Sequence, residues 1–471
     1  MPPVTHFALK EKYEYHDGLG NHHRSEAVPG AVPVVNNHPQ IPPLGLRTEK
    51  ISGTSFVGPR AHNLFTYLYR IESSYQHTEF TEWNHDLEFA NPAPAKHLNP
   101  NSTSWRTYPF PEKGDWMNQR LLASNGNAQQ KTGIAVWVFN AHKDMAPQTA
   151  FTSLDGEALI VPQFGSLDIT TELGKLLVRP NEIAVIPRGM RYRVTLPEGK
   201  PCRGHICELY QGHYRLPELG IIGTTGLANS YDFQVPTASF EGQLERATNG
   251  DQIPVANNGA NKWTIISRLD TKLWTCSQVT TPFNVVGWQG TLYPYKYDLA
   301  RFDTIGNLRY GHVDPSVYVL LTAPAFGKAP GTAVVDFIGV PPRWQAADDT
   351  FGMAWFHRNT MQEFGFPVIN DQRADTPLNN PDTDFSPFGG YLNGAMATHG
   401  PDEPQFQAMR AKDTRTPSRY GNEKITICAI ETECPLYLTD WAHKSAERNL
   451  KAVIEEYFRG KQLQRNPADS K

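Results

Sequence analysis

Short apolar runs broken by turn residues dominate the middle of this chain and limit the folds that are open to it. Between residues 157 and 194, these runs alternate with Gly, Pro-Asn and Pro-Arg-Gly at intervals of about eight to ten residues. That spacing is typical of a small β-barrel or a double-sheet jelly roll. The 37 Gly and 38 Pro residues also favour many short strands and turns over long helices. We therefore predict a mainly β fold.

The length of the chain and one polar segment predict two domains. A chain of 471 residues exceeds what one hydrophobic core usually organises. Residues 240–261 are polar and rich in turn residues, and strand patterns resume beyond them. We predict a β-rich domain over residues 1–260 and a second one over residues 261–471. One amphipathic helix over residues 440–459 and a few other peripheral helices complete this prediction.

Two histidines and one carboxylate in the C-terminal half form a candidate metal site. His357 and Glu363 are six residues apart, and His399 follows in A-M-A-T-H-G-P-D. Side chains separated by an even number project from one face of an extended chain, so His357 and Glu363 can converge. This ligand set favours non-haem Fe(II) and leaves coordination positions open for substrate and oxygen. Spacing alone does not distinguish ligands from surface or hydrogen-bonded histidines, because the chain has 16 histidines.

A second constellation competes for the metal. His312 and Asp314 form a His-x-Asp pair, and His399 with Arg410 would complete the pattern of 2-oxoglutarate-dependent oxygenases. Asp314 precedes Pro315, however, and that combination more often turns or caps the chain than coordinates an ion. We rank this alternative below the first set.

Charge and hydropathy argue against two classes of partner. The formal net charge is −4 and no run of Lys or Arg is long enough to make a phosphate-binding face, so we expect no nucleic-acid partner. The N-terminus lacks the apolar stretch of a secretory signal, and no segment approaches the roughly 18 uninterrupted apolar residues of a membrane helix. Five cysteines, none in C-x-x-C spacing, indicate structural thiols in a reducing compartment. We expect a cytoplasmic protein with no membrane partner.

The strand-rich block resembles a cupin barrel. The stretch L-L-V-R-P-N-E-I-A-V-I-P-R-G, preceded by G-S-L-D-I, has a strand, a tight turn and a second strand before a Pro-x-Gly corner. A metal-binding cupin would also carry His-x-His here, but no histidine lies between His142 and His205. We expect the N-terminal domain to contain a metal-free cupin-like barrel.

Longer sequence blocks follow one another in a characteristic order from about residue 15 to residue 441. They are H-H-R-S-E-A-V-P-G-A-V-P, E-L-Y-Q-G-H-Y-R-L-P-E-L-G, G-L-A-N-S-Y-D-F, P-F-N-V-V-G-W, Y-P-Y-K-Y-D-L, H-V-D-P-S, P-P-R-W, H-R-N-T-M-Q-E-F and T-H-G-P-D. In these blocks the chain resembles the homogentisate 1,2-dioxygenase family, the ring-cleaving enzymes of tyrosine breakdown. The resemblance covers most of the chain.

This resemblance implies a cupin-related dioxygenase of two domains that assembles as a homo-oligomer, either a trimer or a hexamer of two trimers. It implies that Fe(2+) is held in the second domain by His357, Glu363 and His399. It also implies a small aromatic substrate, a hydroquinone with an acidic side chain, whose ring is opened with O2. His312 and Asp314 then move from candidate ligands to supporting roles.

The chain departs from the family at positions expected near the substrate. The family's W-H-G segment reads W-Q-G here, and the resulting Gln289 cannot take a proton near neutral pH. Asn393 replaces a second family histidine, and Gln372 stands about where the family has a substrate-binding tyrosine. Tyr295 and Lys296 are further candidates for substrate binding.

These departures leave three functional hypotheses. The first is a diverged family member that opens a hydroquinone-type or phenolic ring other than or beyond homogentisate. The second is an ordinary homogentisate 1,2-dioxygenase in which the replacements are neutral. The third is a non-catalytic oligomer that still binds metal. We adopt the first as our prediction.

Overall fold

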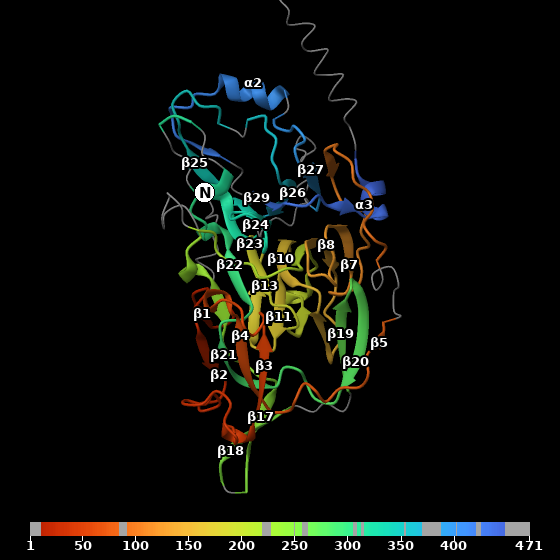
Figure 1. The fold of residues 1–471 in the computed structure, drawn as a ribbon, viewed down its shortest axis with the longest axis vertical. Helices are drawn as coiled ribbons and strands as arrows, with labels where there is room; N and C mark the ends of the chain where they lie inside the picture. Colours follow the sequence, from red (N-terminus) through yellow and green to blue (C-terminus); the bar gives the residue numbers. More distant parts are fainter. Residues whose placement is uncertain are drawn as a thin grey trace, which may run out of the picture.

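The computed structural model describes most of the chain, and the account below is confined to that part. The described residues are 11–83, 92–218, 228–248, 250–256, 262–304, 309–311, 315–352, 355–369, 388–401, 403–420 and 425–447. Within them, strands predominate and two short α-helices, α2 (Glu403–Ala411) and α3 (Asp440–Ser445), lie at the periphery (Figure 1). This confirms the mainly β fold class. Neither of these helices is long and apolar enough to cross a membrane.

The largest sheet runs through the middle of the molecule and has nine strands (Figure 1). In spatial order they are β1 (Tyr15–Asp17), β16 (Gln234–Pro236), β22 (Tyr295–Asp298), β13 (Glu182–Ile186), β10 (Glu157–Phe164), β15 (Cys202–Leu209), β8 (Ile134–Ala141), β7 (Gln119–Ser124) and β30 (Tyr437–Leu438). β8 is buried along its whole length, as its sequence I-A-V-W-V-F-N-A predicts for a central strand.

A seven-stranded sheet packs against this one and completes the first double-sheet unit. Its strands, in order, are β12 (Gly174–Val178), β11 (Leu167–Thr171), β14 (Tyr192–Thr195), β9 (Thr149–Ser153), β19 (Trp263–Leu269), β20 (Lys272–Gln278) and β5 (Thr81–Glu82). Between the sheets, the Arg268 guanidinium lies 3.8 Å from the centre of the Trp137 ring. Arg268 also pairs with the buried Glu208 carboxylate at 3.6 Å. The interior of this unit is therefore packed with side chains.

A six-stranded sheet forms the second unit of the molecule. Its strands, in order, are β23 (Val319–Pro324), β24 (Ala333–Val340), β29 (Ile425–Thr432), β26 (Gln362–Ile369), β27 (Gly390–Asn393) and β6 (Thr103–Trp105). Along β26 the sequence alternates, so Phe364 and Phe366 enter the core while Glu363 faces the other way. The Phe366 ring stacks on buried His205 of β15, with ring centroids 4.0 Å apart. This packing fixes β26 against the first double-sheet unit.

Three smaller sheets complete the described part. One has the order β2 (His23–Glu26), β21 (Val285–Gly290), β4 (Phe65–Arg70) and β3 (Arg47–Ser52). The other two are the pairs β17 (Gly242–Arg246) with β18 (Gln252–Ala256), and β25 (Arg343–Gln345) with β28 (Ser418–Tyr420).

The division between the two units differs from the boundary predicted at residue 260. Strands β19, β20 and β22 follow that position, yet they hydrogen-bond within the nine- and seven-stranded sheets. The polar segment that suggested a linker contains the hairpin β17–β18, which projects from the molecule and is largely exposed (Figure 1). Its composition reflects exposure to solvent. The described strands from β23 to β29 lie outside these two sheets, whereas β6 joins the six-stranded sheet and β30 joins the nine-stranded one.

The C-terminal helix also differs from its prediction over residues 440–459. Thr439 caps α3 through its side chain, as expected for a helix that begins at Asp440. The helix ends at Ser445 because Ala446 is extended and the Glu447 amide donates to the Ser104 carbonyl at 2.8 Å. The rest of the predicted helix, from residue 448, lies outside the described residues.

Candidate metal centre

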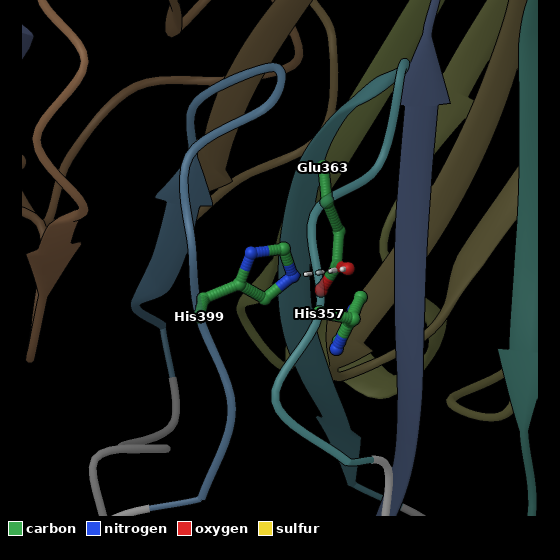
Figure 2. Close-up of side chains that lie close together, drawn as sticks. All are labelled: His357, Glu363 and His399. Atoms are coloured by element: carbon green, nitrogen blue, oxygen red, sulfur yellow. Dashed lines mark ion pairs between the residues drawn. The ribbon is translucent and has the colours of Figure 1, made fainter.

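Three predicted ligands come together at one end of the six-stranded sheet. His357 and His399 lie on two facing segments, and each backbone N–H donates to the carbonyl of the other, at 2.9 and 3.1 Å. Glu363 projects from β26 toward both imidazoles (Figure 2). One donor atom from each residue can be chosen so that all three atoms lie within 4.8 Å of one another. Two histidines and a carboxylate thus converge on one point.

The reason for this convergence differs from the one that the spacing suggested. The chain bends between His357 and the start of β26, so the two residues do not share one regular strand. The amide of Met396 donates to the Asn359 carbonyl at 2.7 Å, which ties the bend to the segment that carries His399. The pairing of two segments, and not an even spacing along one strand, brings the donors together.

Both imidazoles are held in the tautomer that a metal ligand requires. His357 Nδ1 lies 2.7 Å from the Trp355 carbonyl, and His399 Nδ1 lies 3.0 Å from the Ala397 carbonyl. Because a carbonyl only accepts hydrogen bonds, Nδ1 of each ring carries a proton, and Nε2 offers a lone pair to a metal when the ring is neutral. His399 Nε2 is buried and has no hydrogen-bond partner. A buried acceptor of this kind is a place where an ion would bind.

Glu363 supplies the negative charge of the site. Burial alone would raise the pKa of this carboxyl, but His399, the Tyr391 hydroxyl and the charge of His357 lower it below its usual value. For His399, burial lowers the pKa and Glu363 raises it, and the net shift is upward. Nε2 of His399 lies 3.7 Å from Oε2 of Glu363. Without a bound cation, the carboxylate and the imidazole therefore stabilise each other's charged forms.

A row of polar side chains crosses the sheet through Glu363. Asp336 on β24 pairs in register with Glu431 on β29, Glu431 pairs with Glu363, and Glu363 pairs with Asn393 on β27. Residues directly opposite one another in antiparallel strands project from the same face. Burial raises the pKa of Asp336, although a hydrogen bond with Thr322 opposes this shift. The row makes this face of the sheet favourable to a cation.

The donor set fits Fe(II). Two neutral imidazoles and one carboxylate are the ligands of the facial triad in non-haem iron oxygenases. When two ligand atoms each lie about 2.1 Å from an ion and at right angles to one another, they are about 3 Å apart. The atoms His399 Nε2 and Glu363 Oε2 are 3.7 Å apart, so small side-chain movements would bring them to that separation. Three exposed apolar residues, Trp355, Phe356 and Met396, lie within three positions of a proposed ligand in the sequence.

Asn393 and Gln289, the two positions where the family resemblance predicts histidine, lie in different places. Asn393 sits directly opposite Glu363, and its Oδ1 accepts a hydrogen bond from the Ser102 hydroxyl at 2.9 Å. Gln289 lies on β21, where its amide donates to the Tyr69 hydroxyl at 2.7 Å. Strand β21 is well separated from β26 and β27 (Figure 1). Of these two residues, Asn393 adjoins the triad of the same chain and Gln289 does not.

Tyr295 and Lys296, predicted to bind substrate, are both buried on β22. The Lys296 ammonium contacts Glu182 at 3.2 Å and Glu11 at 3.1 Å, and it donates to the Leu177 carbonyl at 3.0 Å. These contacts satisfy the buried ammonium within the nine-stranded sheet. The structure does not bring either residue to the triad.

The remaining predicted site residues cannot be described. His312 and Asp314, and likewise Gln372, lie outside the described residues. Arg410, the arginine of the 2-oxoglutarate alternative, is exposed on α2, where its guanidinium lies 5.8 Å from the centre of the Phe406 ring.

One residue that contacts a proposed ligand was not predicted from the sequence. The Tyr391 hydroxyl donates to Oε1 of Glu363 from the neighbouring strand β27. Tyr391 lies two residues before Asn393, so the two side chains share a face of the strand. The spacing of two between Tyr391 and Asn393 was the signal in the sequence that could have indicated Tyr391. The sequence did not show, however, that β27 pairs with the strand that carries Glu363.

Comparison with known proteins identifies the family. A model described as the homogentisate 1,2-dioxygenase N-terminal domain matches residues 14–299, and one for the C-terminal domain matches residues 300–461. The junction of these models coincides with the end of β22.

Two curated relatives are similar over most of their length. Homogentisate 1,2-dioxygenase of Emericella nidulans is 42% identical over 460 residues, which cover 97% of this chain and 96% of the relative. The enzyme of the same name from Pseudomonas savastanoi pv. phaseolicola is 43% identical over 390 residues, or 82% of this chain and 83% of the relative. A cupin-2 domain protein from Shewanella frigidimarina aligns with 21% of this chain and 83% of its own at 15% identity, but the TM-score of 0.17 is too low to support an argument. The chain belongs to the homogentisate 1,2-dioxygenase family.

Proposed function

We propose that this protein is an Fe(II)-dependent dioxygenase that opens the ring of a hydroquinone-type aromatic acid with O2. His357, Glu363 and His399 would hold the iron. The observation that carries this proposal is the triad itself, in which each imidazole has Nδ1 against a carbonyl and one donor atom from each residue lies within 4.8 Å of the other two. Family membership over nearly the whole chain supports the same chemistry.

Bound iron would supply the one-electron step that lets dioxygen react with a closed-shell aromatic ring. The residues of this chain perform the other tasks. The two neutral imidazoles and one carboxylate leave coordination positions free for the oxygens of a chelating phenol and for dioxygen. Trp355 and Phe356 are 45% and 52% exposed beside the triad and can contact the face of an aromatic substrate.

The identity of the ring is the finer part of the proposal. Asn393 adjoins Glu363 at a position where the family resemblance predicts histidine, and an amide cannot accept a proton near neutral pH. We propose that the substrate is a phenol other than or beyond homogentisate. The identity of 42–43% to two homogentisate 1,2-dioxygenases keeps homogentisate itself as the second candidate.

Oxygen consumption distinguishes these candidates. The protein would be loaded with Fe(II) under argon and mixed with homogentisate, gentisate, substituted hydroquinones and polycyclic phenols, and products would be analysed by mass spectrometry. A product that gains two oxygen atoms from a phenol other than homogentisate is expected. Rapid turnover of homogentisate alone would contradict the divergent substrate, and no product from any phenol would favour a non-catalytic metal-binding oligomer. A His357→Ala variant controls for oxidation by free iron.

We also propose that the protein is a homo-oligomer, a trimer or a hexamer. Several apolar side chains on two N-terminal loops are strongly exposed in a single chain, namely Val34, Val35, Phe56 and Val57. Exposed apolar groups of this kind often mark protein contacts. Light scattering of the purified protein measures the mass directly, and a monomeric mass would contradict the proposal.

A further inference from the structure

A tyrosine on the strand beside Glu363 contacts one of its two carboxylate oxygens. Strands β26 and β27 are antiparallel, with Glu363 opposite Asn393 and Gly365 opposite Tyr391. The Tyr391 side chain extends over Gly365 on the neighbouring strand, and its hydroxyl donates a hydrogen bond to Oε1 of Glu363. The side chain of one strand thus restrains a proposed metal ligand on the next.

Gly365 makes this crossing possible. A methyl group at position 365 would lie 2.1 Å from Cζ of Tyr391 and 2.3 Å from its hydroxyl oxygen. The tyrosine ring therefore occupies the space that any side chain at position 365 would need. Since the conflict is with the end of a side chain, a larger residue there would displace the ring and leave the backbone in place.

The two oxygens of Glu363 consequently face different groups. Oε1 accepts from Tyr391, whereas Oε2 is the oxygen that lies 3.7 Å from Nε2 of His399. A carboxylate with one oxygen engaged in a hydrogen bond offers the other to a metal. The fold therefore assigns different partners to the two carboxylate oxygens before any ion binds.

We propose that Tyr391 is a positioning residue that makes Glu363 a one-oxygen ligand. This inference rests on the proposed function. An octahedral ion with two imidazoles and one carboxylate oxygen has three free positions, which are enough for a chelating phenol and dioxygen together. If both oxygens of Glu363 coordinated, only two positions would remain, and phenol and dioxygen would compete for them. Tyr391 and Gly365 act as a pair that keeps the third position open.

Cobalt provides a test that does not depend on activity. Co(II) would be bound to the purified full-length protein in place of iron, and its visible absorption would be recorded for the wild type, Tyr391→Phe and Gly365→Ala. Tyr391→Phe keeps the ring but removes the hydroxyl, whereas Gly365→Ala keeps the hydroxyl but displaces it. Both variants should show the same change in the positions and intensities of the visible bands, because in both the second carboxylate oxygen replaces another ligand of the ion. Tyr437→Phe, at an exposed position of β30, should match the wild type.

Metal affinity gives the second readout. Competition with a chromogenic chelator should show Co(II) affinity that differs from the wild type to a similar extent in both variants, because both lose the hydrogen bond that orients Glu363. Wild-type spectra and affinity in Tyr391→Phe would overturn the inference while leaving the proposed function intact. Failure of the wild type itself to bind Co(II) and Fe(II) would overturn both. The Gly365→Ala variant keeps the test decisive if Tyr391→Phe does not fold.

Discussion

Replacing Glu363 with alanine should remove most of the stability that the protein gains from ferrous iron. Glu363 is the negatively charged member of the triad, and the two imidazoles that face it are neutral when they bind metal. The three residues belong to two separate chain segments, so an ion at this site ties those segments together. Loss of the carboxylate should therefore weaken both the binding of the ion and the stabilisation that it provides.

The expected size follows from linkage between binding and folding. At an Fe(II) concentration 100 times the dissociation constant, the native state gains about 2.7 kcal/mol. Loss of a group that merely orients a ligand costs up to about 100-fold in affinity, and loss of the charged ligand should cost at least as much. At the same iron concentration, a 100-fold weaker site contributes only about 0.4 kcal/mol. The metal-dependent gain should thus fall by about 2.3 kcal/mol.

Denaturation by urea under argon, with and without Fe(II), measures this gain through circular dichroism. Comparing each protein with itself removes any effect of the substitution on the metal-free fold. Glu245→Gln is the matched control, because Glu245 is exposed on β17 and is not one of the three clustered donors. It should keep most of the metal-dependent gain. If Glu363→Ala keeps the full gain, the assignment of Glu363 as a ligand is wrong.

Three further predictions concern activity, pH and packing. Asn393→His should raise turnover of homogentisate toward the 10²- to 10⁴-fold contribution typical of a proton-transfer histidine, and an unchanged rate would show that the absent histidine is not the obstacle. His213 contacts Glu157 at 2.8 Å, and although burial lowers the pKa of His213, Glu157 raises it and the net shift is upward. The stabilisation that protonated His213 provides is therefore complete below about pH 6.5, the pKa of histidine in the unfolded chain. It is lost as the pH rises through the higher pKa of His213 in the folded protein. Denaturation of wild type and His213→Gln at several pH values should show their difference shrinking as pH rises, and a constant difference would contradict this. Phe366→Ala should destabilise the protein by about 3–5 kcal/mol because the ring is fully buried against His205, whereas Phe366→Leu should cost much less. Equal losses for the two substitutions would exclude cavity formation as the cause.

The sequence alone determined the fold class and the identity of the three clustered residues. The alternation of short apolar runs with turn residues is a local property, because it acts within a few positions of the chain. It predicted β-structure across residues 157–194. The types of residue at positions 357, 363 and 399 were likewise sufficient to suggest iron, because donor chemistry belongs to the side chain and not to its surroundings.

Only the tertiary structure decided how those residues meet and what surrounds them. Strands on both sides of residue 260 belong to the same sheets. The polar segment that suggested a linker is an exposed hairpin, and composition does not distinguish a linker from an exposed strand pair. Gln289 and Asn393 looked equivalent in the sequence, yet β21 and β27 belong to different sheets. The contact of Tyr391 with Glu363 depends on the register between β26 and β27. Register is set by packing between distant segments, so a pattern along one chain cannot reveal it.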